Sequence, residues 1–516
     1  MSWRPQYRSS KFRHVYGKPA SKENCYDGIS ITKSVHDNLF CAVNPRFIAV
    51  VTECAGGGAF FVIPIGLTGK LDPLYPKVCG HRGNVLDVKW NPFDDWIVAS
   101  CSEDCTIKLW EIPKCGIIKN IVNSKLELQG HSRRVGLIEW HPTAKDILFS
   151  AGYDYRVMIW KLNWEESVIT NPVKIMDFHR DVIISISFNT DGSRFATSCK
   201  DRKLRIVDAH SGVVLQESSC KSHKVNKVLF LGNLKMLLTV GSSRWNNRQI
   251  AFWDEEDLSV PLLEEDLDGS SGVLFPFYDP DTHMLYLAGK GDGNIRYYEL
   301  SSEKPYHNYL MDFRSSLPQK GMAVMPKRGL DVSACEVFRF YKLVTIKSLI
   351  EPVSMIVPRR SDSYQDDIYP MTSGAEPALT AQEWLNGINR GPILISLKPG
   401  CNIMHLSSLK AGYNTMTQYD QKEHQDKNYG TLQGFLENKE QKDNLVQVHD
   451  PRKNLISNGF DLSACPAPKT ENELLQMFYR QQEEIRKLRE ILGQKEVRIK
   501  QLELEIKNVR NSPIGY

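Results

Sequence analysis

No long apolar run occurs in the 516 residues of this chain. A membrane-spanning helix needs about 18 or more consecutive, mostly apolar residues, and no segment approaches that length. The first residues, MSWRPQYRSSKFRH, are basic and lack the apolar region of a signal peptide. The sequence therefore predicts no integral membrane segment and no secretory signal.

Metal-binding and phosphate-binding patterns are also missing. The 12 cysteines are scattered, and Cys101 and Cys105 have no second pair that would complete a zinc site. Reduced cytosolic thiols are the favoured interpretation. The glycines 56–58 lack the following helix and lysine of a phosphate-binding loop. A net charge of +4 is too small over this length to indicate nucleic-acid binding. We expect no metal, no cofactor and no nucleic-acid partner.

The sequence contains repeated units built from short predicted strands. One unit covers Gly80–Trp110 and begins with the pair Gly-His. Its apolar-rich segments 85–90 and 96–100 are separated by an Asn-Pro turn and predict two strands, with a third at 106–110. A second unit starts 50 residues later, at His131. A few short strands cannot bury both faces alone, so such units must stack on one another.

Further copies extend the pattern to a complete ring. Units begin at His179 and His223, and a degenerate copy ends at Tyr298. These units resemble the WD40 repeat, which has about 40–45 residues per four-stranded blade. One more blade is expected near residues 39–75 and a last one from residue 321. A strand around residues 12–16 would close the ring and remove its open edge. The predicted fold is all-β, a seven-bladed WD40 propeller over residues 1–346.

Four residue types recur at fixed places in the units: His, Ser or Thr, Asp and Trp. In WD40 blades they form one hydrogen-bonded chain, which stabilises the fold only when every member is satisfied. A Ser/His/Asp hydrolase is the alternative, but the triplet recurs and no nucleophile elbow surrounds the serines, so we expect no enzyme. The predicted sets are His81, Ser100, Asp104 and Trp110; His131, Ser150, Asp154 and Trp160; and His179, Thr197 and Asp201, with Val207 in the place of the Trp.

The composition changes after the propeller. Residues 347–402 are rich in proline and mixed charge and form a C-terminal extension, in which Thr380 and Glu383 predict a capped helix. Residues 403–470 are polar, which predicts a largely disordered linker. Residues 471–510 carry apolar residues in alternating steps of three and four, which predict a coiled coil.

The coiled coil indicates self-association. Arg498 and Glu503 flank Ile499 and Leu502 in a pattern associated with trimers, whereas Ile at a and Leu at d would favour two strands. A trimer is preferred and a tetramer stays open. The residues expected to mediate oligomerisation are Ile485, Leu488, Leu492, Arg498, Ile499, Leu502, Glu503 and Ile506.

Several sequence segments beyond the four recurring residue types resemble the coronins, and the sequence of residues 1–10 is most similar to class 2 members. The resemblance implies an extension packed under the propeller, binding to actin filaments, and an influence on actin organisation and motility. It also implies contacts with the actin-related-protein nucleating complex and with cofilin-pathway proteins, in the cytoplasm and cytoskeleton. The matching segments are Ser10–Val15, Phe40–Pro45, Gly56–Phe60, Lys77–His81, Leu274–Tyr278, Met325–Leu330, Val357–Asp362 and Asp367–Pro370.

Actin filaments are acidic, so basic side chains should make the contact. One departure bears on this: class 1 coronins carry an Arg where this chain has Ser30, although Lys33 lies nearby. The alternative function is a scaffold in a signalling or nuclear corepressor complex with little direct actin binding, which would place the protein in the nucleus as well. The candidate actin-binding residues are Lys11, Arg13, Lys18, Lys33, Arg133 and Arg134.

Overall fold

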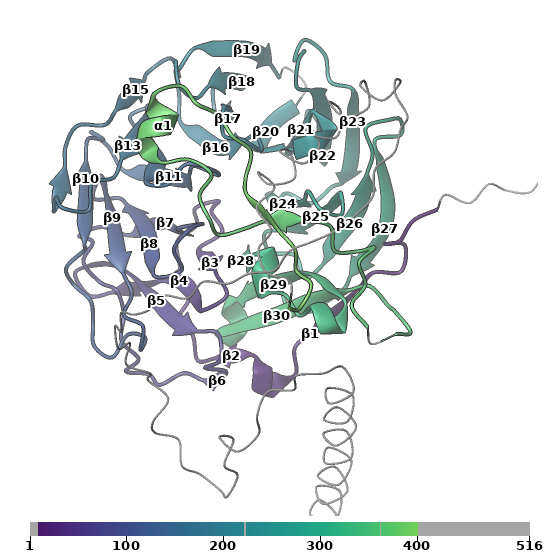
Figure 1. The fold of residues 1–516 in the computed structure, drawn as a ribbon, viewed down its shortest axis with the longest axis horizontal. Coiled ribbons are helices and arrows are strands. Elements are labelled where there is room, and N and C mark those ends of the chain that lie inside the picture. Colours follow the sequence, from purple (N-terminus) through teal and green to yellow (C-terminus); the bar gives the residue numbers. More distant parts are fainter. Residues whose placement is uncertain (1–8, 221–222, 362, 401–516) are drawn as a thin grey trace, which may run out of the picture. The chain divides into compact units, whose positions relative to one another are not determined.

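Seven β-sheets arranged as blades form a ring around a central channel (Figure 1). The structure, a computed structural model, describes residues 9–220, 223–361 and 363–400. Strands dominate these ranges, as the predicted WD40 propeller requires, and that prediction is confirmed. The predicted linker and the predicted coiled coil lie entirely outside the described residues.

Each blade is an antiparallel sheet whose strands follow one another along the chain from the channel outward. Blade 1 is β3 (Cys41–Val43), β4 (Phe47–Cys54) and β5 (Gly57–Pro64). Blade 2 is β7 (Val85–Trp90), β8 (Ile97–Ser102), β9 (Thr106–Glu111) and β10 (Leu126–Gln129). Blade 3 is β11 (Val135–Trp140), β12 (Ile147–Gly152), β13 (Val157–Lys161) and β15 (Lys174–Met176).

Blades 4 to 6 repeat this order. Blade 4 is β16 (Ile183–Phe188), β17 (Arg194–Cys199), β18 (Lys203–Asp208) and β19 (Val214–Ser219). Blade 5 is β20 (His223–Phe230), β21 (Met236–Ser243), β22 (Arg248–Asp254) and β23 (Leu263–Asp268). Blade 6 is β24 (Leu274–Asp279), β25 (Met284–Gly289), β26 (Ile295–Leu300) and β27 (His307–Phe313).

Blade 7 closes the ring with strands from both ends of the propeller. It contains β28 (Gly321–Val324), β29 (Glu336–Val344) and β30 (Leu349–Ile356), and β1 (Tyr16–Pro19) pairs antiparallel with β30. Closure by an N-terminal strand is thus confirmed, although the strand begins where the prediction ended. The propeller also runs past residue 346, because the segment at Thr345–Lys347 is a turn inside blade 7 and not an exit from it.

Short strand pairings, some parallel and some antiparallel, cover the outer edges of three blades. In blade 7, β2 (Tyr26–Asp27) pairs with β30 and with β6 (Gly69–Lys70), which comes from the connection after blade 1. In blade 2, β10 pairs with β14 (Val168–Ile169) from the connection after β13. Val78 bridges Phe60 of blade 1 and Ile121 beside blade 2. These insertions pair edges that would otherwise be open to other chains.

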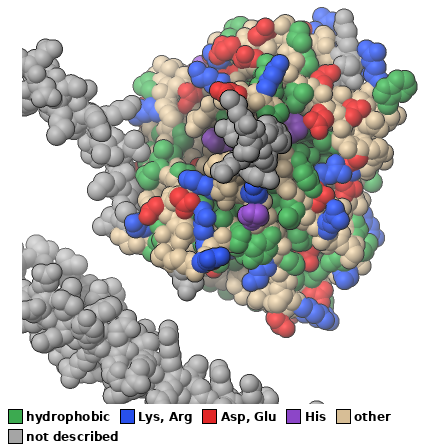
Figure 2. Space-filling view, turned by 90° about the vertical axis from the view of Figure 1, so that its right-hand side faces the viewer, with side chains coloured by type: hydrophobic (Ala, Val, Ile, Leu, Met, Phe, Trp, Pro, Cys, Tyr) green, Lys and Arg blue, Asp and Glu red, His purple; other side chains and the backbone are tan. Residues whose placement is uncertain are grey.

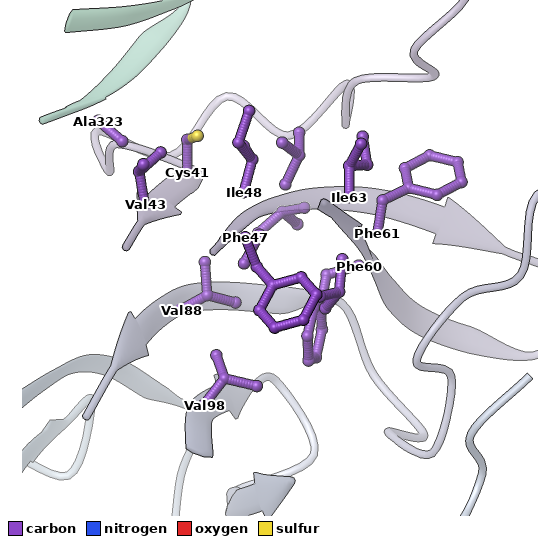
Figure 3. Close-up of a cluster of buried hydrophobic side chains, with 14 of the residues drawn as sticks. Cys41, Val43, Phe47, Ile48, Phe60, Phe61, Ile63, Val88, Val98 and Ala323 are labelled. Carbon is purple, nitrogen blue, oxygen red and sulfur yellow. The ribbon is translucent and has the colours of Figure 1, made fainter. Parts of the chain in front are cut away.

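The apolar core lies mainly between neighbouring blades. Because both faces of a blade are covered by its neighbours, strands such as β4 carry nearly continuous apolar residues. Figure 3 shows Phe47 and Phe60 of blade 1 near Val88 and Val98 of blade 2, with Ala323 of blade 7 in the same cluster. Each blade therefore depends on the next for the burial of its side chains.

The C-terminal extension crosses the face that points toward the viewer in Figure 1. It contains β31 (Thr372–Ser373), α1 (Ala381–Leu385) and β32 (Leu394–Ile395), and β31 pairs with β32. Thr380 and Glu383 form the predicted capping box. The side chain of Trp384 is 1% exposed and belongs to the core cluster of blades 3 and 4.

Candidate functional site

Blade 2 brings its four landmark residues into one hydrogen-bonded chain. His81 Nδ1 lies 2.9 Å from Asp104 Oδ2, and His81 Nε2 lies 2.8 Å from Ser100 Oγ. Trp110 Nε1 donates to Ser100 Oγ at 2.8 Å. Because an indole N–H can only donate, every group is satisfied when Ser100 donates to Nε2 and Nδ1–H donates to Asp104.

The carboxylate end of this chain is held in its ionised form. Burial would raise the pKa of Asp104, but hydrogen bonds from His81, Thr106 and the backbone of Arg82 outweigh burial and lower the pKa below its usual value. The carboxylate thus ties the turn between β8 and β9 to the loop before β7.

Blade 3 repeats the arrangement. His131 Nδ1 lies 3.0 Å from Asp154, His131 Nε2 lies 2.7 Å from Ser150 Oγ, and Trp160 Nε1 donates to Ser150 Oγ at 2.9 Å. The two sets are equivalent in geometry as well as in sequence spacing, which indicates a structural role that is repeated from blade to blade.

Blade 4 does not form the predicted chain. Arg205 lies between the two ends, with Nη1 3.2 Å from His179 Nδ1 and Nη2 2.7 Å from Asp201. Within the described residues His179 Nε2 and Thr197 Oγ1 have no hydrogen-bond partner. The physical reason has two parts. Val207 supplies no donor to the hydroxyl of Thr197, and the buried guanidinium of Arg205 pairs with the carboxylate of Asp201. Burial and the neighbouring guanidinium lower the pKa of His179 to about 3.

Blade 5 keeps only part of the pattern. Trp253 Nε1 donates to Thr239 Oγ1 at 2.8 Å. The place of the Asp is taken by the insertion before β22, and the buried Arg248 instead pairs with Asp268 at 2.8 Å and with Asp292 of blade 6 at 2.7 Å. The hydrogen-bonded chain that joins two loops of one blade is replaced here by an ion pair between blades 5 and 6.

The Ser-His-Asp sets lack the access that a hydrolase needs. The side chains of Ser100 and Ser150 are 0% exposed, and each hydroxyl already accepts an indole N–H. A nucleophile must reach its substrate in a cleft. These buried networks therefore hold loops together and offer no place for a reacting group.

The channel contains a cavity of about 830 Å³ lined by the innermost strands of the blades. A charged layer crosses it, in which Lys89 Nζ lies 2.8 Å from Glu139. Burial raises the pKa of Asp87 to about 6 and lowers the pKa of Lys227 to about 8. Opposite charges in this layer offset one another, so the cavity is polar without a single dominant charge.

Three candidate basic residues lie around one segment, 32–38, that crosses the end of the channel. The guanidinium of Arg134 stacks on Tyr153 at 3.9 Å, and Tyr153 Oη lies 2.7 Å from His36 Nε2. Arg133, the chain neighbour of Arg134, is exposed, and so is Lys33, whose backbone N–H donates to Glu53 Oε1 of blade 1 at 2.6 Å. Arg133 and Arg134 thus lie together in the loop before β11, and Lys33 lies in the segment 32–38 on the side of blade 1.

The other three candidates occupy a different region. Lys11 Nζ donates to the carbonyl of Asp367 in the extension, at 3.0 Å. Lys18 is exposed on β1, and Arg13 is exposed before that strand. Ser30, which stands where class 1 coronins have an Arg, is exposed as well. The six candidates therefore do not form one continuous site. The predicted oligomerisation residues lie outside the described residues.

Sequence reasoning missed the contacts that hold the segment 32–38 in place. Lys290 Nζ donates to the carbonyls of Val35 and His36 and to Asp37, and Asn38 donates to the carbonyls of Leu86 and Gly136. These partners lie 48 to 255 positions away along the chain. No local sequence pattern predicts contacts between residues so far apart in the chain, so they are seen only in the folded propeller.

Within the described ranges, no three metal-ligating side chains lie together in a group that could hold a metal ion. The same part of the chain has no helix that is long and apolar enough to cross a membrane.

The blades and their buried tetrads define a WD40 β-propeller protein. Family models agree over several segments: residues 74–111 match a WD domain, G-beta repeat, and residues 350–392 match a type of WD40 repeat. Residues 138–233 match the WD40 domain of anaphase-promoting complex subunit 4. Residues 5–70 match a domain of unknown function, DUF1899.

Whole-length relatives identify the family. Human Coronin-2A is 66% identical over 519 residues, which cover 99% of both chains, and human Coronin-2B is 63% identical over 513 residues, which cover 99% of this chain and 98% of the relative. The WD40 domain of a Toxoplasma gondii coronin has a TM-score of 0.69 at 26% identity and covers 75% of this chain and 98% of that one. The chain belongs to the coronin family. The resemblance to class 2 coronins is confirmed.

Proposed function

We propose that this chain is an actin-filament-binding regulator and scaffold of the cytoskeleton. The observation that supports the proposal best is whole-length identity of 66% to a coronin, because the resemblance to that family implies binding to actin filaments. On this proposal the protein acts in the cytoplasm, in contact with the actin-related-protein nucleating complex and cofilin-pathway proteins, and it influences motility.

The propeller suits this role because it is rigid and presents several faces. The extension, with Trp384 buried against blades 3 and 4, stiffens one face. Exposed basic residues such as Lys33 and Arg133 are available to an acidic filament. No bond is made or broken in such a function, so it needs neither a cofactor nor a catalytic group.

Avidity completes the proposed mechanism. A coiled coil over residues 471–510 joins the propellers into a trimer, with a tetramer as the other state to test. Linking several weak sites raises the overall affinity by orders of magnitude without any new contact, provided the linker spans the sites. Residues 403–470 supply that linker in the proposal.

Co-sedimentation with actin filaments at two salt concentrations tests the proposal. The full chain is compared with one that ends before Glu471. We expect the full chain to pellet at low salt, the shortened chain to pellet poorly, and added salt to release both, because salt screens contacts between exposed charges. If neither chain pellets at low salt, direct filament binding is wrong.

A further inference from the structure

In each blade, the loop before the first strand and the turn between the second and third strands lie on the face opposite the extension. Hydrogen bonds between His131 and Asp154 place the loop before β11 beside the turn between β12 and β13. The extension contacts the other loops: Leu379 pairs with Ala144 between β11 and β12, and Asn389 bonds to His210 between β18 and β19. Blades 3 and 4 are therefore covered on one face only.

The open face of blades 3 to 5 is strongly basic. Exposed lysines and arginines come from the loops before the first strand, from the start of the first strand, and from the turns between the second and third strands. Among the described residues, only Arg134 of this set forms an ion pair, with Glu103 at 3.8 Å. We define the basic face as Arg133, Arg134, Arg156, Arg180, Lys200, Arg202, Lys224 and Arg244.

Few carboxylates offset this charge. Asp154 is engaged by His131 and Asp201 by Arg205, as described above. Asp177 and Asp181 are the other acidic residues of the same loops. The basic face thus carries a clear excess of positive charge, which produces a field that attracts acidic surfaces.

An exposed tryptophan stands within the basic face. Trp245 lies in the turn between β21 and β22 and is 83% exposed. Its backbone N–H donates to Ser243 Oγ, and Asn246 has a positive φ of 59°, so the turn is ordered. Tryptophan and arginine are the residues that most often carry the binding energy of protein interfaces. Arg244 and Trp245 are adjacent in the chain and both exposed.

The rim differs from this face. Figure 2 shows the rim that bears β23 and β27, where acidic and basic side chains are interspersed. The outer strand of blade 5, β23, exposes Glu264 and Asp266. Mixed charges on the rim give an acidic filament little net attraction, whereas the basic face attracts it, so the charge distribution favours one orientation of the propeller.

We infer that the basic face, with Trp245 as its apolar anchor, is the surface that docks on an acidic protein filament. This inference rests on the proposed function and assigns a surface to it. It moves the centre of the contact from the N-terminal strands, where Lys11 and Lys18 lie, to blades 3 to 5. The acidic groups of the filament meet the basic side chains, and Trp245 packs against an apolar part of the filament surface.

Co-sedimentation of full-length variants with actin filaments tests the assignment. The double variant Lys200→Glu/Arg202→Glu reverses two charges on the basic face, and we expect on the order of tenfold weaker binding at low salt. Trp245→Ala should weaken binding by about tenfold or more, as for an interface anchor. Added salt should weaken filament binding less for the charge-reversed variant than for the wild type, because the variant has already lost electrostatic contacts that salt screens.

Matched controls separate surface chemistry from folding. Lys145→Glu/Lys235→Glu reverses two exposed charges in loops on the extension face, and Lys235 has a positive φ of 52° that matches the 64° of Arg202. Leu74→Ala removes an apolar side chain that is 90% exposed, away from the basic face. We expect both controls to bind as the wild type does.

The outcomes distinguish this inference from the proposed function. If the wild type fails to pellet, the proposed function and the inference both fail. If the wild type pellets and Lys11→Glu/Lys18→Glu is weakened while the basic-face variants are not, the function stands and the inference is wrong. If the basic-face variants lose only their binding to vesicles that contain anionic phospholipid, the face serves a membrane and the inference is again overturned.

Discussion

Trp110 donates its indole N–H to Ser100 Oγ across 2.8 Å, and both groups are fully buried. The hydroxyl of Ser100 therefore links the indole of the third strand of blade 2 to His81 Nε2. In blade 4 the equivalent hydroxyl, on Thr197, has no partner among the described residues. The same position is thus a stabilising link in one blade and an unsatisfied group in another.

Ser100→Ala should destabilise the propeller. It leaves Trp110 Nε1 and His81 Nε2 buried without a partner, and each such group costs about 1–3 kcal/mol. We expect the free energy of unfolding to fall by about 2–5 kcal/mol, measured by urea denaturation followed by tryptophan fluorescence.

Thr197→Val is the matched control for that measurement. It replaces an unsatisfied hydroxyl by a methyl group of similar size, so we expect a change within about 1 kcal/mol. Equal losses for the two variants would mean that the hydrogen-bonded chain of blade 2 has no special energetic role.

Acid should weaken the fold through His141. Burial lowers the pKa of His141 to about 4, while an unfolded histidine titrates near 6.5. Since the folded pKa is depressed, the stability that the neutral ring supplies is present above about pH 6.5 and is lost as the pH falls toward 4. The ring is neutral for a structural reason: Nδ1 accepts the backbone N–H groups of Thr143 and Ala144, and Nε2 donates to the Gly192 carbonyl.

His141→Asn separates this titration from the turn it supports. Asn44 Oδ1 accepts the N–H groups two and three residues later in blade 1, just as His141 Nδ1 does in blade 3. We expect the variant to be less stable at pH 7.5 but to lose about 3 kcal/mol less between pH 6.5 and 4, measured by denaturation at several pH values. Phe188→Leu, which perturbs a ring packed on His141, should keep the wild-type pH dependence. Parallel pH curves for wild type and His141→Asn would contradict the assignment.

The features that could be predicted from the sequence are those that repeat. The 50-residue spacing of His81 and His131 was sufficient to predict two tetrads, because each blade satisfies its own polar groups locally. The seven blades and their closure by an N-terminal strand followed from the need to cover every sheet edge.

What escaped prediction depends on contacts between distant segments. Arg205 enters the space of the third tetrad because Val207 leaves the hydroxyl without a donor, and neither residue alone indicates that exchange. Trp384 lies about 240 residues from its neighbours His141 and Phe149. Loops that are far apart in sequence assemble the basic face, so its charge is hidden in a chain whose net charge is only +4.

Trp384→Ala should detach the extension from blades 3 and 4. Its ring lies 5.0 Å from His141 and 4.6 Å from His210, between centroids. Truncating a buried tryptophan costs about 3–5 kcal/mol, and the loss should fall on the extension. We expect residues 372–395 to lose protection in amide hydrogen exchange while β7 to β9 keep theirs. Ile388→Ala, at an exposed site on the same segment, should leave protection unchanged, and an unaltered extension in Trp384→Ala would show that other contacts hold it.

Gly17→Ala should weaken the closure of the ring. A Cβ at Gly17 would lie 2.6 Å from Cδ2 and 3.2 Å from Cβ of Phe313, a buried residue of β27. Such a contact forces β1 away from blade 6 or Phe313 out of its rotamer, at a cost of about 1–3 kcal/mol. Gly66→Ala is the control, because nothing lies within 4 Å of its added Cβ. We expect a lower midpoint of thermal unfolding for Gly17→Ala only, and equal midpoints would mean that β1 can shift freely along β30, so that the ring does not depend on its tight approach to blade 6.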